Sequence, residues 1–234
     1  MAKERPRKKN LGKPAHVVTS SKSAITKEQI KVLSELGPLA DKRGFYLAGG
    51  LALAFWLGHR TSADFDWFGQ VKFGDGSLLA ESLKCDGIEI QDPKFGRGTL
   101  WGKYKCNKIS FFEYSYPLVA APNRNDKAPC TLASLDDIAA MKLLALTQRS
   151  VKRDFVDVYY LMKNGMTLAH MFEMYKKKFN TVEIVQPKIG LHYFEGAENT
   201  PMPDMIASVE WETIKKTISN ALHEYCKSER SGFA

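Results

Sequence analysis

The sequence of 234 residues has few of the features that mark secreted or membrane proteins. Its four cysteines are widely scattered (Cys85, Cys106, Cys130 and Cys226), and no Cys-x-x-Cys pair occurs. This spacing favours neither a zinc site nor a disulfide framework, so we expect reduced thiols. No run of 18 apolar residues is present, and no apolar segment of the signal-peptide kind follows the basic N-terminus. We therefore expect a cytoplasmic protein that does not enter membranes.

The chain is basic, with a net charge of +8. Part of this excess lies near the N-terminus, where one glutamate, Glu4, is outnumbered by cations (Lys3, Arg5, Arg7, Lys8, Lys9 and Lys13). We interpret residues 1–22 as a flexible basic tail. Such a tail either contacts nucleic-acid phosphates, together with the basic surface of the rest of the chain, or is merely solvated.

Two aspartates two residues apart, Asp64 and Asp66, are the most informative feature. They alternate with Phe65 and Trp67, so on a strand the carboxylates share one face and the aromatic rings the other. Adjacent carboxylates repel each other, and a divalent cation with oxygen ligands relieves that repulsion. Asp-x-Asp alone is also common on solvated strand edges, so the neighbouring residues must distinguish the two interpretations.

A Gly-Gly turn lies upstream of the two aspartates. Gly49 and Gly50 follow a short apolar run and open a short helix, whose free N–H groups can face an anion such as a triphosphate. Combined with the aspartates, this turn predicts a site for a metal ion and nucleotide phosphates.

Charged residues also cluster on two consecutive predicted helices downstream. The first begins with a capping box at residues 134–137 and carries Lys142 and Arg149 on one face. The second carries Asp154 and Asp157, three residues apart. One interpretation is a pair of surface helices with ion pairs, such as Arg153 with Asp157. The other is a phosphate site, for which lysine and arginine are suitable ligands.

Three motifs occur in a characteristic order. They are Gly-Gly-x-Ala-Leu-Ala (residues 49–54), Leu-Gly-His-Arg-x-Ser-x-Asp-Phe-Asp-x-Phe (residues 57–68) and Lys-Leu-x-Ala-Leu-x-x-Arg-x-x-Lys-Arg-Asp-Phe-x-Asp-x-Tyr (residues 142–159). In this order they resemble the AbiEii/AbiGii family of nucleotidyltransferase toxins. The resemblance extends from about residue 45 to residue 161, and more weakly to the end of the chain.

The pattern of elements and the resemblance agree on an α+β fold. We expect a nucleotidyltransferase-like mixed sheet with flanking helices in residues 23–128 and a helical bundle lobe in residues 129–234. Strands are predicted at residues 45–48, 63–68, 87–91, 99–104 and 108–116, and a helix at residues 77–84. From residue 134 onward the pattern is helical apart from a loop at residues 196–203.

The resemblance also implies an activity and its partners. Members of the family use a nucleoside triphosphate (NTP) with Mg²⁺, for which Mn²⁺ can substitute, and some add nucleotides to the acceptor end of tRNA. They serve as toxins of two-gene toxin–antitoxin systems or in phage defence. By this resemblance the chain transfers a nucleotide to a nucleic acid, with RNA and tRNA among the candidate acceptors, and has a cognate antitoxin.

The resemblance assigns roles residue by residue. It implies catalytic roles for four residues, of which the first two bind the metal: Asp64, Asp66, Lys142 and Asp157. Asp154 is the nearby rival of Asp157. The nucleotide-binding candidates are Gly49, Gly50, Arg60, Ser62, Arg149 and Asp154. Four aromatic side chains are expected in the core rather than as base-stacking platforms: Trp56, Trp67, Phe111 and Phe112.

One departure from the wider superfamily affects the predicted activity. A third carboxylate is expected on a later strand beside the aspartate pair, and the aligned position here is Ser110, whereas Glu113 has the opposite side-chain parity. Either another acid such as Asp157 substitutes, or the chain is a weak or inactive module that binds nucleotide or nucleic acid. A toxin that acts through protein contacts alone is a third alternative.

Overall fold

The computed structural model describes residues 23–124 and 128–231, so the predicted tail at residues 1–22 lies outside the described residues. Within them, a seven-stranded mixed sheet has the order β3-β4-β5-β2-β1-β7-β6. The strands are β1 Tyr46–Leu47, β2 Phe65–Gly69, β3 Gln91–Gly96, β4 Thr99–Tyr104, β5 Asn107–Glu113, β6 Asn123–Arg124 and β7 Thr131–Leu132. The helices are α1 Lys27–Lys42, α2 Gly49–Leu57, α3 Ser77–Cys85, α4 Leu135–Gln148, α5 Lys152–Lys163, α6 Leu168–Phe179, α7 Val185–His192, α8 Glu195–Glu198 and α9 Trp211–Ser231.

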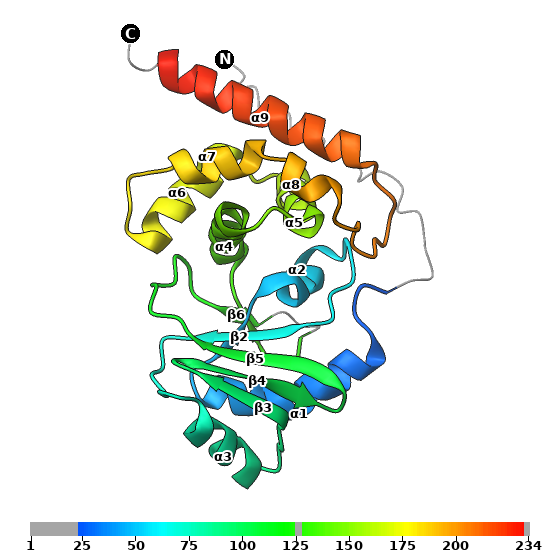
Figure 1. Ribbon diagram of the computed structural model, residues 1–234, viewed down its shortest axis with the longest axis vertical. Coiled ribbons are helices and arrows are strands. Elements are labelled where there is room, and N and C mark those ends of the chain that lie inside the picture. Colours follow the sequence, from blue (N-terminus) through cyan, green and yellow to red (C-terminus); the bar gives the residue numbers. More distant parts are fainter. Residues whose placement is uncertain (1–22, 125–127, 232–234) are drawn as a thin grey trace, which may run out of the picture.

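Helices cover both faces of the sheet (Figure 1). Helices α1 and α3 pack beneath it, whereas α2 and the helical group from α4 to α9 lie above it. No helix in the described parts of the chain has the length and apolar character needed to cross a bilayer. The predicted fold class is confirmed, because a mixed sheet is followed in the sequence by a helical bundle. The proposed lobe boundary after residue 128 stays a prediction.

Side-chain alternation on β2 and β5 separates the core from the upper face of the sheet. Phe65 and Trp67 of β2 are fully buried, as is Phe111 of β5, and their rings belong to the core beneath. Strand β2 runs parallel to β5, and the register pairs Asp66 with Ser110. Paired residues share a face of a sheet, so Ser110 lies beside Asp66 as the sequence predicted.

Local capping explains where two of the helices begin. Thr26 and Gln29 form a capping box at the start of α1, and the Ser134 side chain accepts a hydrogen bond from the backbone N–H of Asp137 at the start of α4. The cap at Ser134 lies in the capping box that the sequence predicted at residues 134–137.

Two predicted segments were wrong. Residues 88–90 are not a strand, and β3 begins only at Gln91, because Ile88 and Ile90 are buried after α3 without pairing to a neighbouring strand. The predicted loop at residues 196–203 is displaced along the chain. Helix α8, whose Ala197 is buried, extends to Glu198, and the non-helical segment then continues through residue 210 until α9 begins at Trp211. In both places the apolar residues are buried by tertiary packing that local patterns do not record.

Candidate active site

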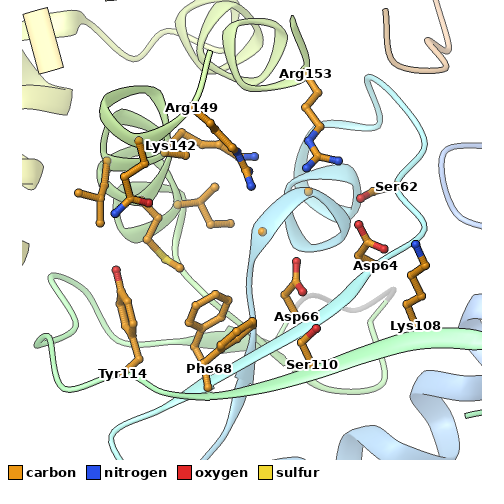
Figure 2. Close-up of a pocket in the computed structure, with 18 of the residues that line it drawn as sticks. Ser62, Asp64, Asp66, Phe68, Lys108, Ser110, Tyr114, Lys142, Arg149 and Arg153 are labelled. Atoms are coloured by element: carbon orange, nitrogen blue, oxygen red, sulfur yellow. The ribbon is translucent and has the colours of Figure 1, made fainter. Parts of the chain in front are cut away.

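A cavity of about 750 Å³ lies between the upper face of the sheet and helices α4 and α5 (Figure 2). Its floor comes from strands β2, β4 and β5, and one wall comes from the first residues of α2. The two glycines of the Gly-Gly turn line it together with charged and polar side chains, which include Arg60, Ser62, Asp64, Asp66, Lys108, Ser110, Lys142, Gln148, Arg149 and Arg153. Two motifs that are far apart in the sequence therefore meet at one cavity.

Asp64 and Asp66 both project into this cavity (Figure 2). Asp66 belongs to β2, whereas Asp64 directly precedes the strand. Burial raises the pKa of Asp66 above its usual range, and the neighbouring Asp64 carboxylate raises that pKa further. A hydrogen bond with Ser110 and the charges of Lys142 and Arg149 oppose this shift without cancelling it. The surroundings of Asp66 therefore disfavour its charged form. A cation bound beside it would lower its pKa and favour the carboxylate.

The Gly-Gly turn brings the start of α2 against the aspartates. Gly49 has a φ of +67°, and a Cβ built on it would lie 3.0 Å from Oδ2 of Asp66. A Cβ on Gly50 would lie 2.6 Å from Oγ of Ser62 and 2.5 Å from a guanidinium nitrogen of Arg60. No side chain in the described part of the chain caps α2, so its first N–H groups remain available to an anion.

A buried network of charges supports one wall of the cavity. Asp157 is completely buried and accepts hydrogen bonds from Nε and Nη2 of Arg60, at 2.6 and 2.8 Å. Nζ of Lys142 lies 2.6 Å from Oδ2 of Asp157, and Nε2 of His59 lies 2.8 Å from Oδ1. Burial alone would raise the pKa of Asp157, but the charges of Lys142 and Arg60 hold it well below its usual range.

Asp154 extends this network on the same helix. Its carboxylate lies 2.8 Å from Nζ of Lys142 and 2.8 Å from Nε of Arg149, and it is also fully buried. Asp154 and Asp157 therefore do not line the cavity. They lie behind its wall and hold in place three cations that do line it, namely Lys142, Arg60 and Arg149. The ion pair between Arg153 and Asp157 that their spacing allows does not form.

No third acid from residues 23–124 or 128–231 joins the aspartate pair. Ser110 occupies the position beside Asp66, and Glu113 instead accepts hydrogen bonds from the backbone N–H groups of Phe73 and Gly74. Both oxygens of Asp157 are already engaged by cations. Among the described residues, no group of three or more His, Cys, Asp or Glu side chains could hold a metal. Asp64 and Asp66 nevertheless fit a Mg²⁺ ion that takes its remaining ligands from water and substrate phosphates.

Two further cations line the cavity, Lys108 and Arg153. Arg153 belongs to the charged cluster that the sequence places on the two downstream helices, whereas Lys108 was not predicted from the sequence. Both cations are exposed, and neither forms an ion pair or hydrogen bond with another described residue. Arg153 extends from α5 toward Ser62 and Asp64, while Lys108 rises from β5 on the far side of Asp64 (Figure 2). Lys108 lies two residues before Ser110 on the same strand, so the two side chains point to the same face of the sheet. This spacing could have identified Lys108 as a residue of the site.

The expectation for the aromatic residues was wrong at one position. Trp67 and Phe111 are core residues with no exposed surface, as predicted, and the indole N–H of the half-buried Trp56 donates to the carbonyl of Ala133. Phe112, in contrast, lines the cavity, because alternation along β5 turns it to the upper face once Phe111 is buried.

Comparisons with known proteins agree on the family and the fold. The family described as "Nucleotidyl transferase AbiEii toxin, Type IV TA system" matches residues 110–229. An uncharacterized protein of Aquifex aeolicus, aq_aa25, is 33% identical over 207 residues, which cover 87% of this chain and 98% of the relative.

Two solved structures have similar folds. JHP933 from Helicobacter pylori is 18% identical, with 90% of this chain and 96% of that chain covered and a TM-score of 0.50. MenT4, a nucleotidyltransferase toxin from Mycobacterium tuberculosis H37Rv, is 12% identical, with 82% and 80% covered and a TM-score of 0.52. At these identities the two structures support the fold alone.

Proposed function

The chain belongs to the AbiEii family of nucleotidyltransferase toxins, and from this premise we propose that it transfers a nucleoside monophosphate from an NTP to RNA. In this reaction a hydroxyl group of the RNA attacks the α-phosphate and pyrophosphate leaves. The observation that carries the proposal is the convergence on one cavity of two carboxylates, a helix N-terminus and several cations. Among the residues that the structure describes, no side chain caps this helix and none pairs with Lys108 or Arg153. Acids that bind a metal, and donors and cations that bind phosphate, are the parts that nucleotidyl transfer needs.

The two carboxylates are the proposed metal ligands. Asp64 and Asp66 would hold Mg²⁺, or Mn²⁺ in its place, and a divalent cation there supplies neutralisation of the charge that develops on the reacting phosphate. Ser110 hydrogen-bonds to Asp66 and thereby helps to orient its carboxylate.

The triphosphate would lie between α2 and α5. The N–H groups at Gly49 and Gly50 and the hydroxyl of Ser62 face it from one side, and the guanidinium groups of Arg149 and Arg153 face it from the other. Arg60 and Lys142 are held by their ion pairs, so they supply fixed positive charge at the wall. Asp154 and Asp157 act as positioning residues for these cations, and no reacting atom needs to touch them.

The attacking hydroxyl would be positioned rather than strongly activated. With Ser110 in place of a third carboxylate, rate acceleration would come mainly from the alignment of the two substrates and from stabilisation of charge. We propose RNA as the acceptor, with tRNA as the first candidate, and the cytoplasm as the place where a toxin of this kind meets NTP, acceptor and cognate antitoxin.

Incubation of the purified chain with each α-³²P-labelled NTP, Mg²⁺ and total RNA, followed by a denaturing gel, tests the proposal. The expected result is labelled RNA with at least one NTP, which is lost in Asp64→Ala. The matched control is Glu89→Ala, because Glu89 is exposed and does not line this cavity. Label transfer by Asp64→Ala at the wild-type rate would contradict the proposal.

The replacement of a third acid by Ser110 favours one alternative, an inactive module that binds nucleotide or nucleic acid. In that case the chain would bind NTP with Mg²⁺ but label no RNA. A toxin that acts through protein contacts alone would remain toxic after loss of both Asp64 and Asp66, whereas a transferase would not.

A further inference from the structure

The proposed phosphate ligands line only one half of the cavity. The floor of the other half consists of aromatic side chains from the sheet. The rings of Phe68 and Phe112 stack with centroids 4.9 Å apart and an interplanar angle of 27°. Tyr114 meets Phe68 edge-on at 5.1 Å, and Trp101 meets Phe112 edge-on at 6.4 Å. All four side chains line the cavity, and Trp101 remains 40% exposed.

The register places this aromatic floor next to the proposed reaction centre. Phe68 and Phe112 pair with each other, and they follow the paired Asp66 and Ser110 by two residues on the same strands. Two residues along a strand correspond to about 7 Å, so the stacked rings begin one side-chain row beyond the carboxylates. A group joined to a phosphate through a ribose would therefore reach the rings while its phosphate stays at Asp64 and Asp66.

The opposite wall completes a slot for a flat group. Ile138, Met141 and Ala145 of α4 line the cavity above the aromatic floor. The hydroxyl of Tyr114 points from the sheet toward α4 (Figure 2) and has no hydrogen-bond partner among the described residues. A slot with apolar faces and a free polar atom at its edge can stack a heteroaromatic ring and accept or donate one hydrogen bond.

We propose that this aromatic half of the cavity is a nucleobase site, in which the base packs against the rings of Phe112 and Phe68 beneath α4. The proposal rests on the proposed function, because it assumes that the phosphates lie at the polar half. A nucleobase can come from two sources, the NTP or the terminal nucleotide of the acceptor RNA. The chemistry of recognition is the same for both, and the experiment distinguishes them.

The binding test compares ligands with and without a base. Calorimetric titrations with ATP, GTP, CTP, UTP and inorganic tripolyphosphate, each with Mg²⁺, give the affinities of the wild type, Phe112→Leu and Trp101→Leu. If the NTP supplies the base, the wild type binds at least one NTP more tightly than tripolyphosphate. Each variant then loses about fivefold to a hundredfold in affinity for that NTP and none for tripolyphosphate, the range expected for loss of stacking.

A second measurement, the KM for RNA in the transfer reaction, tests whether the acceptor supplies the base. If the base belongs to the acceptor, NTP affinity stays unchanged in both variants and the KM for RNA rises by a similar factor. Phe95→Leu is the matched control, because Phe95 is an exposed aromatic residue of the same sheet outside this cavity. Leucine retains apolar volume at position 112. Trp101 is partly exposed, so its replacement should not impair folding.

The inference is overturned if both variants bind every NTP as the wild type does and also keep the wild-type KM for RNA. Failure of the proposed function gives a different pattern, in which the wild type binds NTP but transfers no label. In that case the binding comparison between NTP and tripolyphosphate still decides whether the NTP supplies the base, and the affinity for RNA, measured by direct titration, replaces the KM in the acceptor test.

Discussion

Lys142 and Asp157 form a buried ion pair that joins α4 to α5, with Nζ 2.6 Å from Oδ2. The same carboxylate binds Arg60 and His59, which follow α2 in the sequence. One fully buried acid thus fixes a cation of the cavity wall from the helical lobe and another from the segment that leads to the aspartate pair. The network therefore couples the stability of the fold to the geometry of the site.

Asp157→Ala should strongly destabilise the protein. It would leave Arg60 and Lys142 with less compensation in a buried site, and breaking a buried pair in this way typically costs about 3–5 kcal/mol. Urea unfolding measures the effect. Glu89→Gln is the control, because Glu89 pairs with Lys84 on the surface and its loss should not change the midpoint measurably. Equal midpoints for Asp157→Ala and the wild type would contradict a central role for this acid.

The same network predicts a loss of stability in acid. The pKa values of Asp157 and Asp154 are both lowered in the folded protein. A depressed carboxyl pKa stabilises the folded state above the unfolded pKa of about 3.9, and this contribution disappears as the pH falls below that value. Unfolding free energies measured from pH 7 down to pH 3 should therefore fall for the wild type. The fall should be shallower for Asp157→Asn, and parallel curves would rule out this linkage.

Ionisation of Asp66 should have the opposite effect on the stability of the folded protein. Its pKa is raised in the fold, so its charged form destabilises the folded state once the pH exceeds the unfolded value. Asp66→Asn should therefore raise the melting temperature at pH 7 in the absence of metal, while transfer activity falls roughly a thousandfold or more. Mg²⁺ with NTP should raise the melting temperature of the wild type and not that of the variant. A variant that is less stable than the metal-free wild type would refute the assigned repulsion.

Ser110→Asp should restore a third acid at the position paired with Asp66. The extra carboxylate should lower the Mg²⁺ concentration required for half-maximal transfer, because it adds a hard oxygen ligand. It should also reduce stability at pH 7 without metal, since three acids would then repel one another. Ser110→Asn supplies the uncharged control of similar size. An unchanged Mg²⁺ requirement in Ser110→Asp would show that this position does not face the metal.

Local sequence patterns predicted the parts of the site that depend on local geometry. The alternation of side chains along β2 placed Asp66 on the face of the sheet away from Phe65 and Trp67. The same alternation along β5 placed Ser110 and Glu113 on different faces. These predictions hold because the side chains of a strand alternate whatever the tertiary context.

The partners of the buried acids could not be predicted in this way. Arg60 and Asp157 are 97 residues apart, and nothing in the periodicity of either segment indicates that they meet. The spacing of Arg153 and Asp157 suggested a local ion pair, but a better-buried bidentate partner from another segment took that carboxylate. Phe112 was assigned to the core because a half-buried aromatic residue in a strand does not reveal which side of the sheet holds a cavity.

The most direct test of the account is a crystal structure of the chain with Mn²⁺ and a non-hydrolysable NTP, with the metal located by its anomalous signal. We expect a metal peak about 2.0–2.6 Å from carboxylate oxygens of both Asp64 and Asp66. We also expect the triphosphate to contact the N-terminus of α2. A nucleotide bound elsewhere, with the two carboxylates free of metal, would contradict both expectations.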